Sequence, residues 1–268
     1  MRRRPAVAGQ FYHGTSVKLN HQVQQYVDAR NPAKQNALGI LSPHAGLIYS
    51  GSVAGSVYSQ ILFPETFILI GPNHTGLGAH MALMDHGEWE IPTGVLNVDE
   101  RLSRKILANV PMVSSDTQAH LFEHSLEVQL PFITYFSKET KIVPLTIMSA
   151  TPEDCKLLGE GIAKSIREVP YPVVIVASSD MSHYLSDDTA RRKDKMAIDR
   201  MVSLDPEGLY RTVKREEISM CGYLPATVML HAVKSLGASV AKLIRYATSA
   251  EVSGDYDHVV GYAGIIIS

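Results

Sequence analysis

The sequence has few cysteines, little net charge and no long apolar run, and each of these shortages excludes a class of protein. Its 268 residues include two cysteines, Cys155 and Cys221, too few for a disulfide scaffold of this size. The formal net charge of −2 gives no electrostatic case for nucleic acid or an anionic membrane as the main partner. No stretch approaches the roughly 20 apolar residues of a membrane span. The basic residues 2–4 are not followed by the apolar region of a secretory signal. We therefore expect a soluble cytoplasmic protein with reduced thiols.

What the sequence does contain is an alternation of apolar runs and helical patterns. With 45% hydrophobic residues it can bury a full core, and no repeat, linker or change in composition divides it, so we expect a single domain over residues 1–268. Continuous apolar runs of strand length predict strands buried on both faces at 38–46, 67–76, 141–149 and 173–183, with a hairpin within 81–99 and a closing strand at 258–267. Helical patterns occupy 99–110, 151–169, 187–204 and 221–237. This alternation favours an α/β domain with helices on both sides of a largely parallel sheet.

Polar side chains stand at the ends of three of these apolar runs. "ILSPHAG" ends with His44, "ILIGPNHTG" with His74, and "VIVASSDMSH" with Asp180 and His183. In open α/β sheets ligands bind outside the carboxyl ends of the strands, so we expect these four side chains at one edge of the sheet. A single histidine at such a place could simply be a hydrogen-bonded strand-end residue. Four independent polar endings favour a functional cluster.

Two further segments carry reactive groups. "LFEHSLEVQLPF", residues 121–132, reads as a partly buried helix in which Glu123 and His124 would orient a ligand or move a proton, unless they form a solvated helix face. Cys221 precedes an apolar helix, and the helix N-terminus would favour its thiolate, although a free cysteine is often just a small buried hydrophobe. Cys155, within a helix, is expected to be structural. Two neutral imidazoles with a thiolate or a carboxylate would make a metal site with open positions.

Seven segments taken together resemble the Memo family, the protein B component of AmmeMemoRadiSam systems. They follow the family's order and cover nearly the whole chain: "RRPAVAGQFY", "LSPHAGLIYSG", "LIGPNHTG", "FEHSLEVQLPF", "SSDMSHY", "CGYLPATVML" and "GYAGII". The resemblance implies a three-layer α/β/α sandwich around a mixed, mostly parallel sheet, similar to class III extradiol dioxygenases. It also implies two histidines and one cysteine as metal ligands, which here are His44, His74 and Cys221. Four further positions match polar residues that line the cleft in this family: Asp180, His183, Glu123 and His124. The resemblance implies catalytic roles for them.

The same resemblance implies a redox protein with iron or copper, or else zinc, as its metal. Dioxygenases of this fold complete their iron site with a carboxylate, whereas Cys221 stands at the third position here, so catechol ring cleavage does not transfer. Two alternatives remain: a non-catalytic module that binds a peptide or protein in the same cleft, and a metal-dependent hydrolase. The expected partners are a small molecule or peptide and, from the family's co-occurrence in prokaryotes, an AMMECR-type domain protein and a radical SAM protein.

Overall fold

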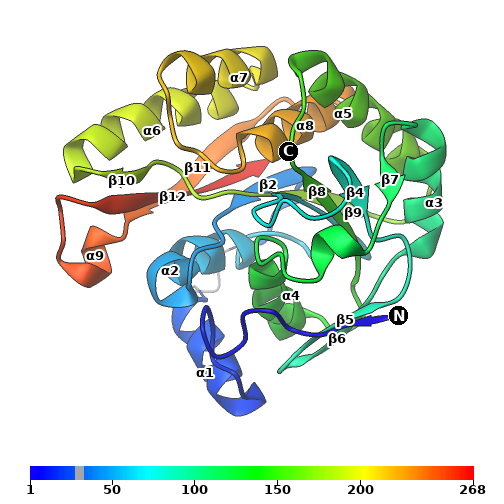
Figure 1. Ribbon diagram of the computed structural model, residues 1–268, viewed down its shortest axis with the longest axis horizontal. Coiled ribbons are helices and arrows are strands. Elements are labelled where there is room, and N and C mark those ends of the chain that lie inside the picture. Colours follow the sequence, from blue (N-terminus) through cyan, green and yellow to red (C-terminus); the bar gives the residue numbers. More distant parts are fainter. Residues whose placement is uncertain (28–32) are drawn as a thin grey trace.

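The computed structural model, which describes residues 1–27 and 33–268, has a mixed nine-stranded sheet between two layers (Figure 1). The strand order is β10-β12-β2-β9-β3-β8-β4-β7, with β11 paired to β12. These strands are β2 (Gly39–Ser42), β3 (Thr66–Pro72), β4 (Met81–Leu83), β7 (Ser114–Ser115), β8 (Lys141–Ile147), β9 (Val173–Ser178), β10 (His183–Leu185), β11 (Ala241–Thr248) and β12 (Val259–Ile267). The central strands β2, β9, β3 and β8 are parallel, while β12 and β4 flank them in antiparallel pairing. The predicted α/β/α sandwich around a mixed sheet is confirmed.

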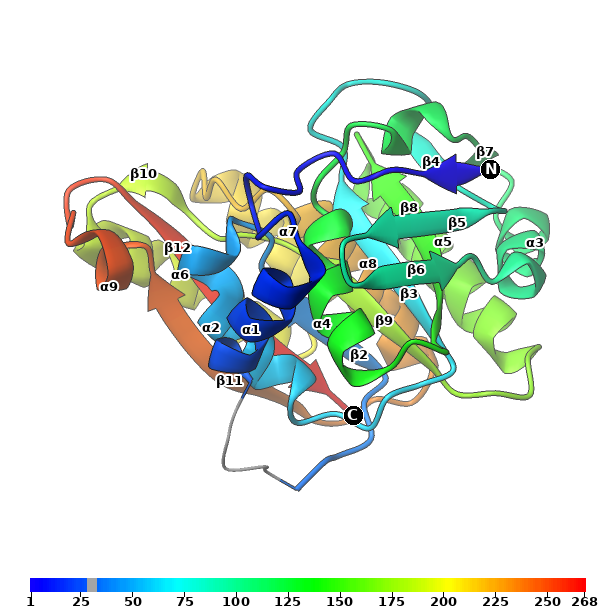
Figure 2. The same ribbon diagram turned by 90° about the horizontal axis from the view of Figure 1, so that it is seen from below.

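Helices cover both faces of this sheet. One layer holds α3 (Glu100–Asn109), α5 (Pro152–Arg167), α6 (Asp187–Val202), α7 (Pro206–Arg215) and α8 (Tyr223–Ser235). The other holds α1 (Ser16–Tyr26), α2 (Leu47–Tyr58), α4 (Leu130–Phe136) and a small sheet of β1 (Arg2–Arg3), β5 (Glu88–Ile91) and β6 (Gly94–Asn97), as Figure 2 shows. The described residues also include three short helices, η1 (Gln118–His120), η2 (Glu127–Gln129) and α9 (Ala250–Ser253).

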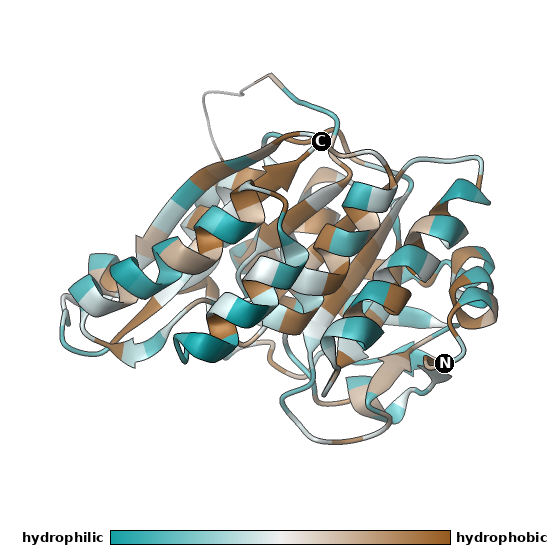
Figure 3. Cartoon of the chain, turned by 90° about the horizontal axis from the view of Figure 1, so that it is seen from above, coloured by the Kyte–Doolittle hydropathy of each residue, from teal (hydrophilic) through white to brown (hydrophobic). Residues whose placement is uncertain are grey.

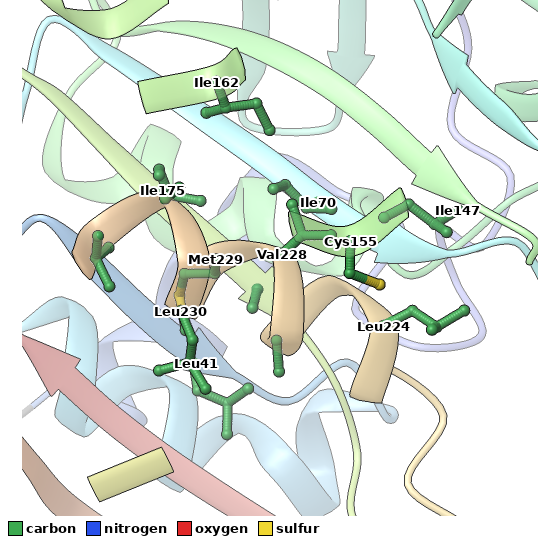
Figure 4. Close-up of a cluster of buried hydrophobic side chains, with 14 of the residues drawn as sticks. Leu41, Ile70, Ile147, Cys155, Ile162, Ile175, Leu224, Val228, Met229 and Leu230 are labelled. Atoms are coloured by element: carbon green, nitrogen blue, oxygen red, sulfur yellow. The ribbon is translucent and has the colours of Figure 1, made fainter. Parts of the chain in front are cut away.

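Two apolar cores lie on opposite faces of the sheet. Successive strand residues point to opposite faces, so Leu41 belongs to the core under α5 and α8 while Ile40 belongs to the core under α1, α2 and α4. Ile68 and Leu69 divide in the same way. The strands are apolar on both sides for this reason, and in Figure 3 they form a hydrophobic layer beneath helices whose polar sides face outward. Cys155 lies fully buried among the side chains of the α5–α8 core (Figure 4), where a structural cysteine is expected.

Capping residues in the sequence match the observed starts and ends of helices. The side chain of Asp99 accepts a hydrogen bond from the backbone of Leu102 at the start of α3. Thr151 and Asp154 form a reciprocal capping box at the start of α5. Gly237, with a φ of +97°, follows α8 in the left-handed conformation that glycine adopts without strain. The predicted helix and strand cores are therefore observed with shifts of a few residues at their ends.

One helix prediction needs correction. Residues 121–126 are not helical, and α4 begins at Leu130. The carbonyls of His120 and Glu123, which a helix would use, accept hydrogen bonds from the Arg3 guanidinium instead, at 2.8 and 2.6 Å. The predicted hairpin within 81–99 is confirmed as β5 and β6, while β4 from the same stretch joins the large sheet.

Candidate metal centre

The parallel strands bring the predicted histidines to one edge of the sheet. His44 and His74 each lie two residues beyond their strands, β2 and β3, and both strands pair with β9. The two imidazole rings approach to 5.3 Å between centroids. Cys221 arrives from a separate element, just before α8, and its Sγ lies 3.3 Å from Nε2 of His44. The spatial expectation from the sequence, two imidazoles beside one sulfur, is what the structure shows.

This group has the spacing of a metal site. One ligand atom each from His44, His74 and Cys221 can be chosen so that all three lie within 4.8 Å of one another. Donors bound at zinc-like distances to one tetrahedral ion are separated by about 3.5 Å. The 3.3 Å between Sγ of Cys221 and Nε2 of His44 is close to that separation, so the residues present could hold a metal ion.

A buried serine fixes the tautomer of His44. The hydroxyl of Ser178 donates its one proton to the carbonyl of Ser125 at 2.6 Å and accepts from the Gln129 amide at 2.8 Å. Nδ1 of His44, 2.9 Å from the same oxygen, must therefore be the protonated nitrogen. The lone pair is left on Nε2, which faces Cys221. Burial, reinforced by the neighbouring His124 and His74, holds the pKa of His44 well below its usual range, which keeps the ring neutral.

A buried carboxylate performs the same task for His74. Oε1 of Glu123 accepts from Nδ1 of His74 at 2.9 Å and from the backbone of Ser125 at 2.8 Å, while Oε2 accepts from the backbone N–H of His74. Burial opposes ionisation of Glu123, but these hydrogen bonds prevail and lower its pKa to about 2. Metal-binding histidines are commonly oriented by such a carboxylate. Glu123 is thus placed behind the ligand position rather than facing the reacting atoms.

The surroundings of Cys221 oppose the thiolate that the sequence predicted. Burial, together with the nearby carboxylate of Asp180, raises the pKa of the Cys221 thiol well above its usual range. The backbone N–H of Asp180 donates to Sγ at 3.3 Å and lowers the pKa of the thiol, but burial and the Asp180 carboxylate raise it by more. Cys221 would ligate a cation only after losing its proton, so metal uptake is coupled to proton release. The sequence prediction considered only the helix N-terminus and overlooked this burial.

An open cleft of about 320 Å³ lies over the histidines. It is lined by His124, Asp180 and His183 together with Phe11 and Tyr184 and the two candidate histidine ligands. The strand β9 ends at Ser178, so His183 belongs to the next strand, β10, instead of ending the apolar run. Its Nδ1 donates to the carbonyl of Ser219 at 2.8 Å, which leaves its Nε2 as an acceptor.

Asp180 and His124 both line this cleft but make different contacts there. Oδ1 of Asp180 accepts from the backbone N–H groups of His44 and Ala45 at 2.8 and 3.2 Å, and therefore holds the turn that carries His44. Burial raises the pKa of Asp180. The ring of His124 stacks on His74, with centroids 4.6 Å apart. All four residues predicted as catalytic thus lie at the site. Two of them hold the candidate ligands in place, because Glu123 is bound to His74 and Oδ1 of Asp180 is bound to the turn that carries His44.

A second set of potential ligands, His74, Glu123 and His124, lies beside the first. On a helix, adjacent residues such as Glu123 and His124 would point apart, but the observed loop brings both to His74. The oxygens of Glu123 are already occupied by three hydrogen bonds, so metal binding there would have to break them. In the set with Cys221, His44 and His74 could bind a metal ion through Nε2 and keep the hydrogen bonds at their Nδ1 atoms.

Sequence reasoning missed two residues that build the site. Ser178 lies inside a continuous apolar strand, and nothing in the order of residues marks it as the partner of His44. Phe11 packs against His124 with centroids 4.8 Å apart and forms a wall of the cleft. The quoted segment "RRPAVAGQFY" contained Phe11, but no spacing rule linked it to a histidine more than 100 residues away.

The fold and the donor group define an α/β/α sandwich protein with a His–His–Cys cluster at the carboxyl edge of its parallel strands. A family model described as Memo-like protein matches residues 3–266. The chain therefore belongs to the Memo family, as its sequence segments predicted. No helix among the described residues has the length and apolar content needed to cross a membrane.

Curated relatives of similar length support this assignment. A MEMO1 family protein of Sulfurisphaera tokodaii is 38% identical over 281 residues, which cover 99% of each chain. A MEMO1 family protein of Methanosarcina mazei is 40% identical over 266 residues, covering 99% of this chain and 98% of the relative. Among solved structures, an uncharacterized protein of Escherichia coli K12, JW3007, superposes with a TM-score of 0.55 over 85% of this chain and 98% of that one. At 16% identity this last likeness concerns the fold alone.

Proposed function

We propose that this protein binds a redox-active metal, iron or copper, through His44, His74 and Cys221, and acts on a small molecule or peptide that enters the cleft above them. The observation that carries the proposal is the convergence of three donor atoms within 4.8 Å. Both imidazoles already have their protons on the far nitrogen, toward Ser178 and Glu123. Such preorganisation is what a metal site needs and a packed core does not.

The mixed donor set favours a metal with some affinity for sulfur. A thiolate beside two imidazoles suits copper, iron and zinc better than the hard cations that prefer oxygen ligands. When bound, an iron or copper ion would supply one-electron chemistry to a substrate in the cleft.

The chain's own groups would bind and protonate that substrate. His183 lines the cleft, and with Nδ1 donating to the Ser219 carbonyl a neutral ring would offer Nε2 as a proton acceptor. Asp180 lines the same cleft, and burial raises its pKa, so it can hold a proton there. Phe11 and Tyr184 supply apolar walls.

Anaerobic purification followed by elemental analysis tests this proposal. We expect about one iron or copper ion per chain, and at least a tenfold loss of bound metal in His44→Ala and in His74→Ala. His86→Ala is the matched control, because His86 is an exposed histidine that pairs with Asp85 away from the cleft.

Each other outcome selects a different function. Stoichiometric zinc together with water-consuming chemistry would make the protein a hydrolase. A wild-type chain that stays folded and takes up no metal would leave a peptide- or protein-binding module. Unchanged metal content in Cys221→Ser would remove the thiolate from the ligand set.

A further inference from the structure

We infer that Arg3, at the very start of the chain, is a positioning residue of the metal centre, acting through Glu123 on His74. The inference rests on the proposed function for its metal readout, but its structural part stands alone. Arg3 lies in β1 and is 1% exposed, which is unusual for an arginine. Its guanidinium lies over the ring of Trp89, with Cζ 4.1 Å from the ring centroid.

The guanidinium is bound to the loop that carries Glu123. Nε donates to the carbonyl of His120 at 2.8 Å, and Nη2 donates to the carbonyl of Glu123 at 2.6 Å. Both carbonyls flank the three-residue stretch from which the Glu123 side chain extends to His74. The planar fork of arginine can serve two carbonyls and a carboxylate at once, which a lysine ammonium cannot do in the same geometry.

The remaining arm of the fork anchors Arg3 itself. Nη1 donates to Oε2 of Glu127 at 2.6 Å, and Glu127 is fully buried. The same carboxylate accepts from the backbone of Ala6 and Val7 and from the hydroxyl of Tyr12. Glu127 therefore binds the N-terminal segment to the interior, and through Arg3 that segment holds the Glu123 loop.

The chain of contacts from Arg3 to the metal ligand is continuous. Arg3 fixes the main chain of Glu123, the carboxylate of Glu123 accepts from Nδ1 of His74, and Nε2 of His74 is thereby left free for a cation. Without Arg3, the Glu123 loop would lose the two hydrogen bonds that the guanidinium makes to its carbonyls, and the Glu123 carboxylate would be held less firmly beside His74. His74 would then lose its fixed tautomer.

Two variants and one control test this role. Arg3→Met removes all donors, while Arg3→Lys keeps a positive charge beside Glu127 but not the fork. Arg2→Met is the control, because Arg2 is the neighbouring arginine, 54% exposed and paired with Glu88 at the surface. Folding of each variant is checked by circular dichroism before any comparison.

The first readout needs no metal. Two-bond proton–nitrogen correlation spectra of the imidazoles should show one His74 tautomer, protonated at Nδ1, in the wild type and in Arg2→Met. In Arg3→Met, and to a smaller degree in Arg3→Lys, we expect a mixture of both tautomers. A single wild-type tautomer in both folded Arg3 variants would overturn the inference, and if Arg3→Met does not fold, Arg3→Lys decides alone.

The second readout is Co²⁺ affinity from anaerobic spectroscopic titration. We expect about a tenfold weaker affinity in Arg3→Met than in the wild type, an intermediate value in Arg3→Lys, and no change in Arg2→Met. Equal affinity in all four folded proteins would contradict a positioning role. If the wild type itself binds no Co²⁺, the proposed metal site fails, while the tautomer spectra still decide whether Arg3 positions His74.

Discussion

At the scale of single residues, the site depends on side chains that never face the cleft. Ser178 has no access to solvent, yet it decides which nitrogen of His44 carries the proton. Its hydroxyl can do so because its own proton is committed to the carbonyl of Ser125. A hydroxyl with free rotation would accept either tautomer, so the buried network, rather than the serine alone, presents Nε2 to the cleft.

Replacing Ser178 by alanine should therefore weaken both the site and the fold. The change leaves Nδ1 of His44 without its acceptor and removes one acceptor of the Gln129 amide, which keeps the Pro43 carbonyl at 2.9 Å. This should cost about 1–3 kcal/mol of the free energy of unfolding. Metal affinity should fall about 10- to 100-fold. Urea unfolding and anaerobic metal titration measure the two effects.

Ser42 offers the matched control for this change. It is a buried serine two residues before His44, and its hydroxyl has no hydrogen-bond partner within the described part of the chain. Ser42→Ala should leave affinity and stability within about 0.5 kcal/mol of the wild type. Equal metal affinity in the two alanine variants would show that Ser178 does not fix His44.

At the scale of elements, the third donor depends on how closely α8 approaches β9. Cys221 comes directly before Gly222, whose backbone N–H donates to Oγ of Ser179 just beyond β9. A Cβ atom on Gly222 would lie 2.3 Å from the carbonyl oxygen of Ser178. The start of α8 can come this near only because residue 222 has no side chain.

Gly222→Ala should force the first turn of α8 away from the strand and carry Cys221 with it. We expect a loss of about 1–3 kcal/mol in the free energy of unfolding, together with weaker metal binding. Gly94→Ala in β6 is the control, because a Cβ atom there would meet nothing within 4 Å. Urea midpoints that agree between the two variants would rule out this close approach.

At the scale of the whole molecule, buried ionisable groups make stability depend on pH. His120 is fully buried beside Arg3, and burial followed by the charge of Arg3 lowers its pKa from 6.5 to about 4. The unfolded chain binds a proton at this histidine below pH 6.5, whereas the folded chain does not until about pH 4. Stability is therefore fully present above pH 6.5 and is lost as the pH falls toward 4.

The expected loss from His120 between pH 7 and pH 4.5 is about 2 kcal/mol. His120→Gln keeps a side-chain amide that can donate to the carbonyl of Ala82, as Nε2 of the histidine does, but it does not titrate. Between pH 7 and pH 4.5, the free energy of unfolding of His120→Gln, measured with urea, should fall by about 2 kcal/mol less than that of the wild type. His258→Gln, at a site 71% exposed, should keep the wild-type slope, and identical slopes in both variants would contradict the assignment.

The amino-acid order by itself determined the sandwich and the edge at which the site lies. Strands such as β3 and β9 are continuous apolar runs because they are covered on both faces, and that signal is local. Polar residues directly after such runs, His44 and His74, must share an edge once the strands are parallel. Short spacing rules suffice for both inferences.

Only the tertiary structure decided how the site is held and protonated. The loop around Glu123 is not helical, and Arg3, 120 positions away, binds the Glu123 carbonyl. No local propensity contains that contact. Burial raises the pKa of the Cys221 thiol, against the effect expected of a helix N-terminus, and burial is a property of the packed chain. Hydrogen bonds and desolvation between distant segments depend on positions in space, whereas patterns along a sequence record only near neighbours.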